Sequence, residues 1–170
     1  YHRSRKLHES TVTLDSHCDT PMFFPDSQDD VNHMFTTRTD RVLVDLPKMT
    51  DGRLDASIMV AYIPQGERSA QGYHEAFALA QKKLDQIEAL TRAYPHLLGL
   101  ASSPDDLLRF KAQGIKAIMR GIENGYAIGR DLSLLSHFRQ MGVVYMTLCH
   151  NGDNDICDSA RGHAEHGGLS

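Results

Sequence analysis

The sequence LDASIMVAYI, at residues 54–63, is an apolar run that Pro64 closes directly. A short run that is apolar at almost every position predicts a strand covered on both faces, which is the kind found in parallel sheets. Proline cannot donate to a strand ladder, so the strand is expected to end there. Shorter apolar segments predict further strands at residues 10–14, 97–101, 115–122 and 143–149, and a short strand or edge at 41–46.

Helical patterns separate most of these strands. Residues 69–94 carry one apolar stripe and end before Pro95, which predicts a long helix. Ser103 and Pro104 are typical of a helix start, and Gly114 of its end. Residues 131–141 predict a third helix, closed by Gly142. The expected inward-facing residues of the three helices are Tyr73, Phe77, Ala80, Leu84 and Ile87; Leu107, Leu108 and Phe110; and Leu134, Leu135, Phe138 and Met141.

The remaining segments are less regular. Residues 1–9 are expected to form a helix or arm, 22–41 a long loop, 47–52 a single turn and 153–170 a polar, loop-like tail. Strands that alternate with helices indicate an α/β protein with a parallel sheet and right-handed crossovers. A (β/α)₈ barrel and an open doubly wound sheet both fit this order. No GxGxxG motif follows a strand, so a dinucleotide-binding sheet is unsupported.

The composition excludes several classes of protein. The chain has 170 residues, 41% apolar residues and a net charge of −4, which suits one globular domain and offers no basic stripe for nucleic acid. No apolar run is long enough to span a membrane. No two of the three cysteines have the spacing of a CxxC motif, so neither a disulfide framework nor a zinc knuckle is expected. Because the chain begins at Tyr1 rather than Met, we expect a trimmed start. A periplasmic or secreted location and a cytoplasmic one both stay open.

The strongest chemical signal is DSHCDTP at residues 15–21. In an extended strand His17 and Asp19 share one face, and an imidazole beside a carboxylate suits a borderline divalent metal such as zinc. Asp15 shares their parity, whereas Cys18 has the opposite parity and is expected to pack outward. Glu123 and His150 also follow predicted strands. Because active sites of barrels form at the carboxyl ends of strands, these positions favour the barrel.

These motifs together resemble the renal (membrane) dipeptidase family, the M19 metallopeptidases of the amidohydrolase superfamily. The similar segments are DSHCDTP at 15–21, IENG at 122–125 and YMTLCHN at 145–151, with Leu132, Gly142, Asn154 and Asp158-Ser159-Ala160. Three positions depart from the family pattern, namely Asn124 for the frequent Gly, Val144 for Arg and Cys149 for Thr. They neighbour the expected site, so they bear on substrate preference more than on the chemistry.

The resemblance implies a zinc-dependent dipeptidase that hydrolyses the peptide bond of dipeptides through a metal-bridging hydroxide. His17 and Asp19 would bind the first zinc, Glu123 would bridge two zinc ions, and His150 would bind the scissile carbonyl oxygen. Asp15 and Asn151 would hold these residues in position without binding the metal themselves. A full barrel needs about 250 residues, so we expect residues 1–170 to be the N-terminal half of one metallo-dipeptidase barrel domain, with the second metal site incomplete and the fragment itself inactive.

A half barrel would pair with its missing C-terminal half, associate with itself or aggregate, because its sheet edges are open. His163 and His166 follow no strand and are expected to be solvated loop residues. Two alternatives stay open at this point. One is an amidohydrolase that acts on another amide, such as an N-acyl amino acid. The other is a non-catalytic scaffold built on the half barrel.

Overall fold

In the computed structural model, which describes residues 2–170, five strands form one sheet in which all the pairs are parallel. The strands are β1 (Leu14–Cys18), β2 (Ala56–Tyr62), β3 (Leu98–Leu100), β4 (Lys116–Glu123) and β5 (Val143–Met146). β2 is buried along nearly its whole length, as its apolar sequence predicts. The predicted α/β class is confirmed.

At the carboxyl ends of the strands, neighbouring strands follow one another in the order of the chain, as they do in a barrel. β2 pairs with one edge of β4 along nearly the whole of that strand, from Ala117 to Glu123. The other edge is shared, with β3 pairing from Lys116 to Ile118 and β5 pairing from Arg120 to Ile122. At the carboxyl ends the neighbours are therefore β1, β2, β4 and β5, which is the arrangement of successive strands in a (β/α)₈ barrel.

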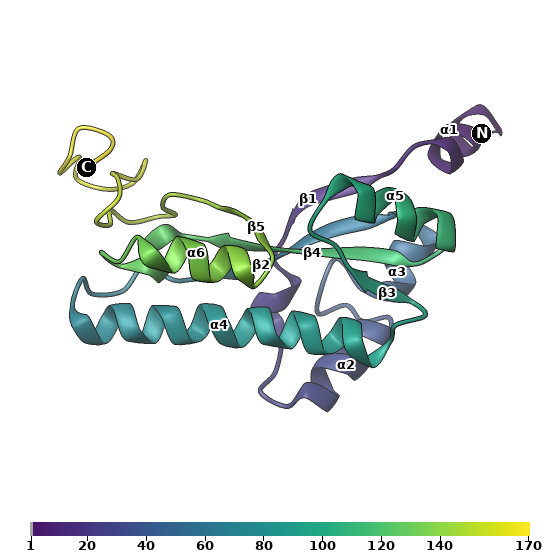
Figure 1. Ribbon diagram of the computed structural model, residues 1–170, viewed down its shortest axis with the longest axis horizontal. Helices are drawn as coiled ribbons and strands as arrows, with labels where there is room; N and C mark the ends of the chain where they lie inside the picture. Colours follow the sequence, from purple (N-terminus) through teal and green to yellow (C-terminus); the bar gives the residue numbers. More distant parts are fainter. Residues whose placement is uncertain (1) are drawn as a thin grey trace.

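Helices cover both sides of this sheet. The long helix α4 (Ala70–Ala93) lies along one side, and α5 (Pro104–Gln113) lies on the opposite side (Figure 1). α6 (Ser133–Gln140) precedes β5, and α1 (His2–Ser10) extends away from the sheet at the N-terminal end. The segment between β1 and β2 contains the 3₁₀ helix η1 (Thr20–Phe23) and the helices α2 (Gln28–Thr36) and α3 (Leu46–Asp51).

The core divides between the two sides of the sheet. On the α4 side, Met59 and Ile118 pack with Ile87 and Leu90 of the helix. On the other side, Ile58, Val60 and Met119 form a second cluster, against which Leu107 and Phe110 of α5 pack. All five residues of the predicted α4 stripe belong to the core clusters or pack against them, namely Tyr73, Phe77, Ala80, Leu84 and Ile87.

Several local expectations are wrong. Residues 41–46 form no strand, because Asp45 caps α3 there. The expected loop at 22–41 contains α2, and the expected turn at 47–52 is the helix α3. Ser10 ends α1, so the first strand starts at Leu14 rather than before it. Leu108 and Leu135 are exposed, at 61% and 45%. Tyr1 of the expected arm lies outside the described residues.

Among residues 2–170, no helix combines the length and the apolar character that crossing a bilayer requires.

Candidate metal centre

Three side chains from the ends of two strands converge on one point. His17 lies near the end of β1, Asp19 follows that strand, and Glu123 is the last residue of β4. His17 Nε2 is 3.2 Å from Asp19 Oδ1 and 3.5 Å from Glu123 Oε2. One ligand atom from each of the three residues lies within 4.8 Å of the others. A nitrogen and two carboxylate oxygens at this separation are a donor set suited to a divalent cation.

Strand β1 is irregular at His17. The β1–β2 register shifts between Asp15 and Cys18, so three steps on β1 match two on β2. Such bulges often occur next to active sites, where they re-aim a side chain. The strict alternation on which we placed Asp15 beside His17 and Asp19 therefore does not hold. Asp15 Oδ1 instead accepts a hydrogen bond from the backbone N–H of His17 at 3.1 Å, within the irregular part of the strand.

Buried amides hold the loop that follows Glu123. Asn124 is fully buried, and its Nδ2 donates to the carbonyl of Ile63 and to Gln65 Oε1. Asn154, also buried, donates to Asn124 Oδ1 and to the carbonyl of Leu148. These bonds connect the loops that follow β2, β4 and β5, which fixes the backbone around the cluster.

His150 lies on the other side of Glu123. β5 ends at Met146 rather than at the predicted Cys149, and His150 stands in the loop beyond it. Its Nε2 is 3.6 Å from Glu123 Oε1, and its ring meets Tyr62 edge-on with centroids 5.0 Å apart. The two oxygens of Glu123 thus face two different imidazoles. Asn151 is exposed in the same loop.

Sequence reasoning missed Tyr145 as part of this site. The hydroxyl of Tyr145 is 2.7 Å from His17 Nδ1 and donates to the carbonyl of Ser16 at 3.2 Å. Burial, together with the charges of Glu123, Asp19 and Asp15, raises the pKa of Tyr145 to about 12, so the hydroxyl stays protonated at neutral pH. The only sequence signal was its place in YMTLCHN, which shows nothing of a contact with β1.

The surroundings of one carboxylate oxygen in the cluster indicate whether a metal ion fits there. Asp19 Oδ1 is buried and has no hydrogen-bond partner among the described residues. A buried polar oxygen without a partner is rare and needs a physical reason. A cation between His17, Asp19 and Glu123 supplies one, because it would coordinate this oxygen directly. The residues present therefore fit a divalent metal.

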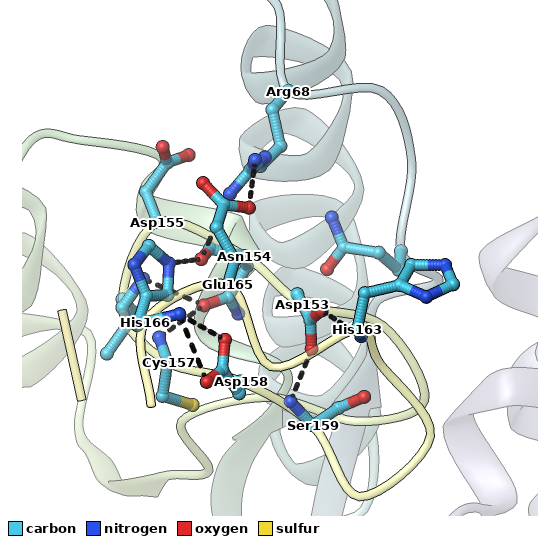
Figure 2. A network of polar contacts seen from close by, with 12 residues as sticks. Arg68, Asp153, Asn154, Asp155, Cys157, Asp158, Ser159, His163, Glu165 and His166 are labelled. Atoms are coloured by element: carbon cyan, nitrogen blue, oxygen red, sulfur yellow. Dashed lines mark hydrogen bonds and ion pairs between the residues drawn. The ribbon is translucent and has the colours of Figure 1, made fainter. Parts of the chain in front are cut away.

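The C-terminal tail has a different role, although it is rich in acids and histidines. Asp153 accepts from the backbone N–H groups of Ser159 and His163, and Asp158 accepts from those of His166 and Gly168 (Figure 2). These carboxylates are occupied in folding the tail. His163 is exposed as expected, but His166 is not simply solvated, because its Nε2 lies 2.9 Å from the carbonyl of Asn154. Arg68 ties the tail to the loop before α4 through Glu165.

All three cysteines are free thiols, and Cys18 and Cys157 are buried. Cys18 packs in the core cluster with Met59, on the α4 side of the sheet. Burial raises the pKa of the Cys18 thiol. The thiol therefore stays protonated, whereas cysteine binds metal ions as the thiolate.

The fold and the cluster together define an α/β protein of the barrel type, with a mixed nitrogen and oxygen cluster at the carboxyl ends of its strands. The chain belongs to the membrane dipeptidase family, peptidase family M19, which matches residues 1–170. The resemblance seen in the sequence motifs is therefore confirmed.

Named relatives agree with this assignment. The chain is 27% identical to Dipeptidase verJ of Clonostachys rogersoniana over 99% of its own length and 45% of the relative. It is 31% identical to Dipeptidase tcpJ of Claviceps purpurea over 75% of its length and 31% of the relative. Dipeptidase 3 of Rattus norvegicus is 30% identical over 90% of the chain. The chain thus spans less than half the length of these relatives.

Solved structures share the fold. The probable dipeptidase PvdM from Pseudomonas aeruginosa superposes with a TM-score of 0.84 at 25% identity, over 99% of this chain and 44% of that one. A metallo peptidase from Rhodobacter sphaeroides, liganded with a phosphinate mimic of L-Ala-D-Ala, gives a TM-score of 0.67 at 18% identity over 78% of this chain. The fold is therefore that of part of a barrel.

Proposed function

We propose that this chain contributes part of the active site of a zinc dipeptidase, with His17, Asp19 and Glu123 as ligands of the first metal. The observation that carries the proposal is the convergence of these three ligand atoms within 4.8 Å, with a buried Asp19 oxygen that has no hydrogen-bond partner. Family membership supports a peptide substrate, and relatives that are named dipeptidases support a dipeptide.

Glu123 is suited to bridge two metal ions. Its Oε2 faces His17 and its Oε1 faces His150, so the two oxygens point to different sides. Its side chain is only 16% exposed, which limits its motion. A bridging carboxylate needs this kind of fixed placement, because each oxygen serves a different cation.

His150 is suited to bind the substrate. Its side chain is 32% exposed, and the edge-on contact with Tyr62 restrains the ring. An imidazole N–H directed at the scissile carbonyl oxygen would stabilise negative charge as it develops there. When bound, the metal would polarise the same carbonyl and lower the pKa of the attacking water.

We further propose that residues 1–170 are the N-terminal part of a single metallo-dipeptidase barrel domain. In the described part of the chain, β1 pairs only with β2, and β5 pairs only with β4. Each therefore has an edge free to pair with further strands or with another copy of the chain. One group of potential ligands is present among residues 2–170, so ligands of a second metal would come from elsewhere.

Zinc binding to His17→Ala tests the metal centre. Loss of the imidazole should lower zinc affinity at least about 100-fold in competition with a chelator, because the loss of even an indirect support of a metal ligand costs 10- to 100-fold. The matched control is His163→Ala, which removes an exposed tail imidazole and should leave the affinity unchanged. Equal zinc affinity in wild type and His17→Ala would contradict the proposed ligand set.

Hydrolysis of dipeptides tests two proposals, namely the substrate and the assignment of residues 1–170 as only part of the barrel. The zinc-loaded chain alone should show little or no activity, whereas addition of the complementary segment of a full-length relative should restore hydrolysis of dipeptides. A panel of N-acyl amino acids in the same assay separates a dipeptidase from another amidohydrolase. Full turnover by the chain alone with two bound zinc ions would overturn the proposed division.

A further inference from the structure

Tyr145 makes a connection across the sheet that strand pairing does not require. Tyr145 lies on β5 and His17 on β1, and β2 and β4 separate these two strands in the sheet. The hydroxyl of Tyr145 nevertheless reaches both the carbonyl of Ser16 and the ring of His17. The sheet must therefore curve enough to bring its first and fourth barrel strands within the length of one side chain.

Gly121 makes this reach possible. A Cβ atom at position 121 would lie 3.0 Å from Tyr145 Cζ and 3.2 Å from Cε1, which is tighter than ordinary van der Waals contact. The missing side chain on β4 thus leaves the space through which the tyrosine ring passes. The rings of Tyr145 and His17 then lie 26° from parallel, with centroids 6.1 Å apart.

The direction of the hydrogen bond from Tyr145 decides which tautomer of the imidazole is compatible with the contact. A phenol has one proton to donate, and a backbone carbonyl can only accept. When Tyr145 donates to Ser16, His17 Nδ1 must carry a proton and donate to the phenol oxygen. A neutral imidazole protonated at Nδ1 presents a lone pair at Nε2, and Nε2 is the atom that faces Asp19 and Glu123.

We propose that Tyr145 is a positioning residue that holds the ring of His17 and its Nδ1-protonated tautomer, so that Nε2 is ready to bind the metal. This inference rests on the proposed metal centre. Metal-binding histidines generally donate their second ring N–H to an acceptor that fixes the ring, and loss of that acceptor weakens metal binding. Here the acceptor is a tyrosine hydroxyl from a strand that is not adjacent in the sheet.

Tyr145→Phe tests the inference, because it removes one oxygen and keeps the ring. Zinc affinity should fall about 10- to 100-fold, while Tyr94→Phe, the same change at the far end of α4, should leave it unchanged. In the zinc-loaded wild type, ¹⁵N-edited NMR should show a slowly exchanging Nδ1–H proton on His17. That signal should be lost to solvent exchange in Tyr145→Phe, which a general loss of stability would not produce selectively.

Gly121→Ala is the second variant, because it keeps the hydroxyl but crowds the ring, and it should also lower zinc affinity. If Tyr145→Phe folds poorly, Gly121→Ala and the NMR signal decide. Unchanged zinc affinity in a folded variant, or a retained Nδ1–H signal without the hydroxyl, would overturn the positioning role and leave the metal centre intact. A wild type that does not bind zinc through His17 would overturn both, and the His17→Ala comparison separates these cases.

Discussion

At the scale of single residues, the loop after β4 explains a departure from the family pattern. Asn124 has φ = +85°, a backbone conformation that glycine adopts without strain and that asparagine tolerates better than most residues. This position, where the family often has Gly, combines a positive φ with a side chain that connects three loops. Gly125 beside it has no such freedom to vary, because a Cβ there would lie 2.8 Å from the carbonyl of Leu148.

Asn124 should contribute to stability through these hydrogen bonds. Asn124→Ala should lower the free energy of unfolding by about 3 kcal/mol, because it strains the backbone and leaves buried partners without a hydrogen bond. Asn124→Gly removes the same bonds but relieves the strain, so its loss should be smaller. Urea unfolding of the two variants checks this order, and equal losses would show that the positive φ is not the cause.

The sequence could predict which residues come together at the candidate site, but not how their side chains are held. His17, Asp19, Glu123 and His150 lie near or beyond the carboxyl ends of strands, and parallel strands present these ends at one edge. The contact between Tyr145 and His17 depends instead on the curvature of the whole sheet and on the space above Gly121. Neither the curvature of the sheet nor the space above Gly121 depends on residues that are close together in the sequence. No spacing of residues in the sequence therefore predicts the contact.

At the scale of elements, the strands and long helices were predictable because their signals are strong. α5 has the expected cap, in which Ser103 and Asp106 satisfy each other's backbone N–H groups and Gly114 ends the helix in the left-handed conformation. The short helices α2 and α3, which were expected to be a loop and a turn, have weaker but recognisable signals in the sequence. Val31, Met34 and Phe35 repeat at helical spacing after Ser27, and Asp45 precedes Pro47 as a cap.

The cap of α3 gives a prediction that depends on pH. Asp45 is fully buried and accepts from the backbone N–H groups of Lys48 and Thr39. Burial alone would raise the pKa of Asp45, but these hydrogen bonds and the Lys48 ammonium outweigh it and lower the pKa. The stabilisation is therefore complete above the unfolded pKa of about 4 and is lost as the pH falls through the lower folded value.

Asp45→Ala should accordingly lower the free energy of unfolding at pH 7 by about 3 kcal/mol, and the difference from wild type should shrink below about pH 4. The control is Asp40→Ala, which changes an exposed acid in the same segment. Denaturant unfolding at several pH values measures both. A difference that stays constant down to pH 2 would contradict the role of the carboxylate.

At the scale of the whole molecule, the strands β1, β2, β4 and β5 place the candidate metal centre at their carboxyl ends. The predicted choice of a barrel over an open sheet rested on where the polar residues fall, and the structural relatives agree with it. The tail shows the limit of such reasoning, because its acids and histidines resemble a second metal site in composition. Asp153 and Asp158 are instead occupied by backbone N–H groups, which only the folded loop reveals.

The most direct test of the central claim is the position of zinc in an anomalous difference map from crystals of the zinc-loaded chain. We predict one strong peak, coordinated by His17 Nε2 and by oxygens of Asp19 and Glu123. A peak in the tail beside Cys149, Cys157 or His166, or no peak near His17 at saturating zinc, would contradict it.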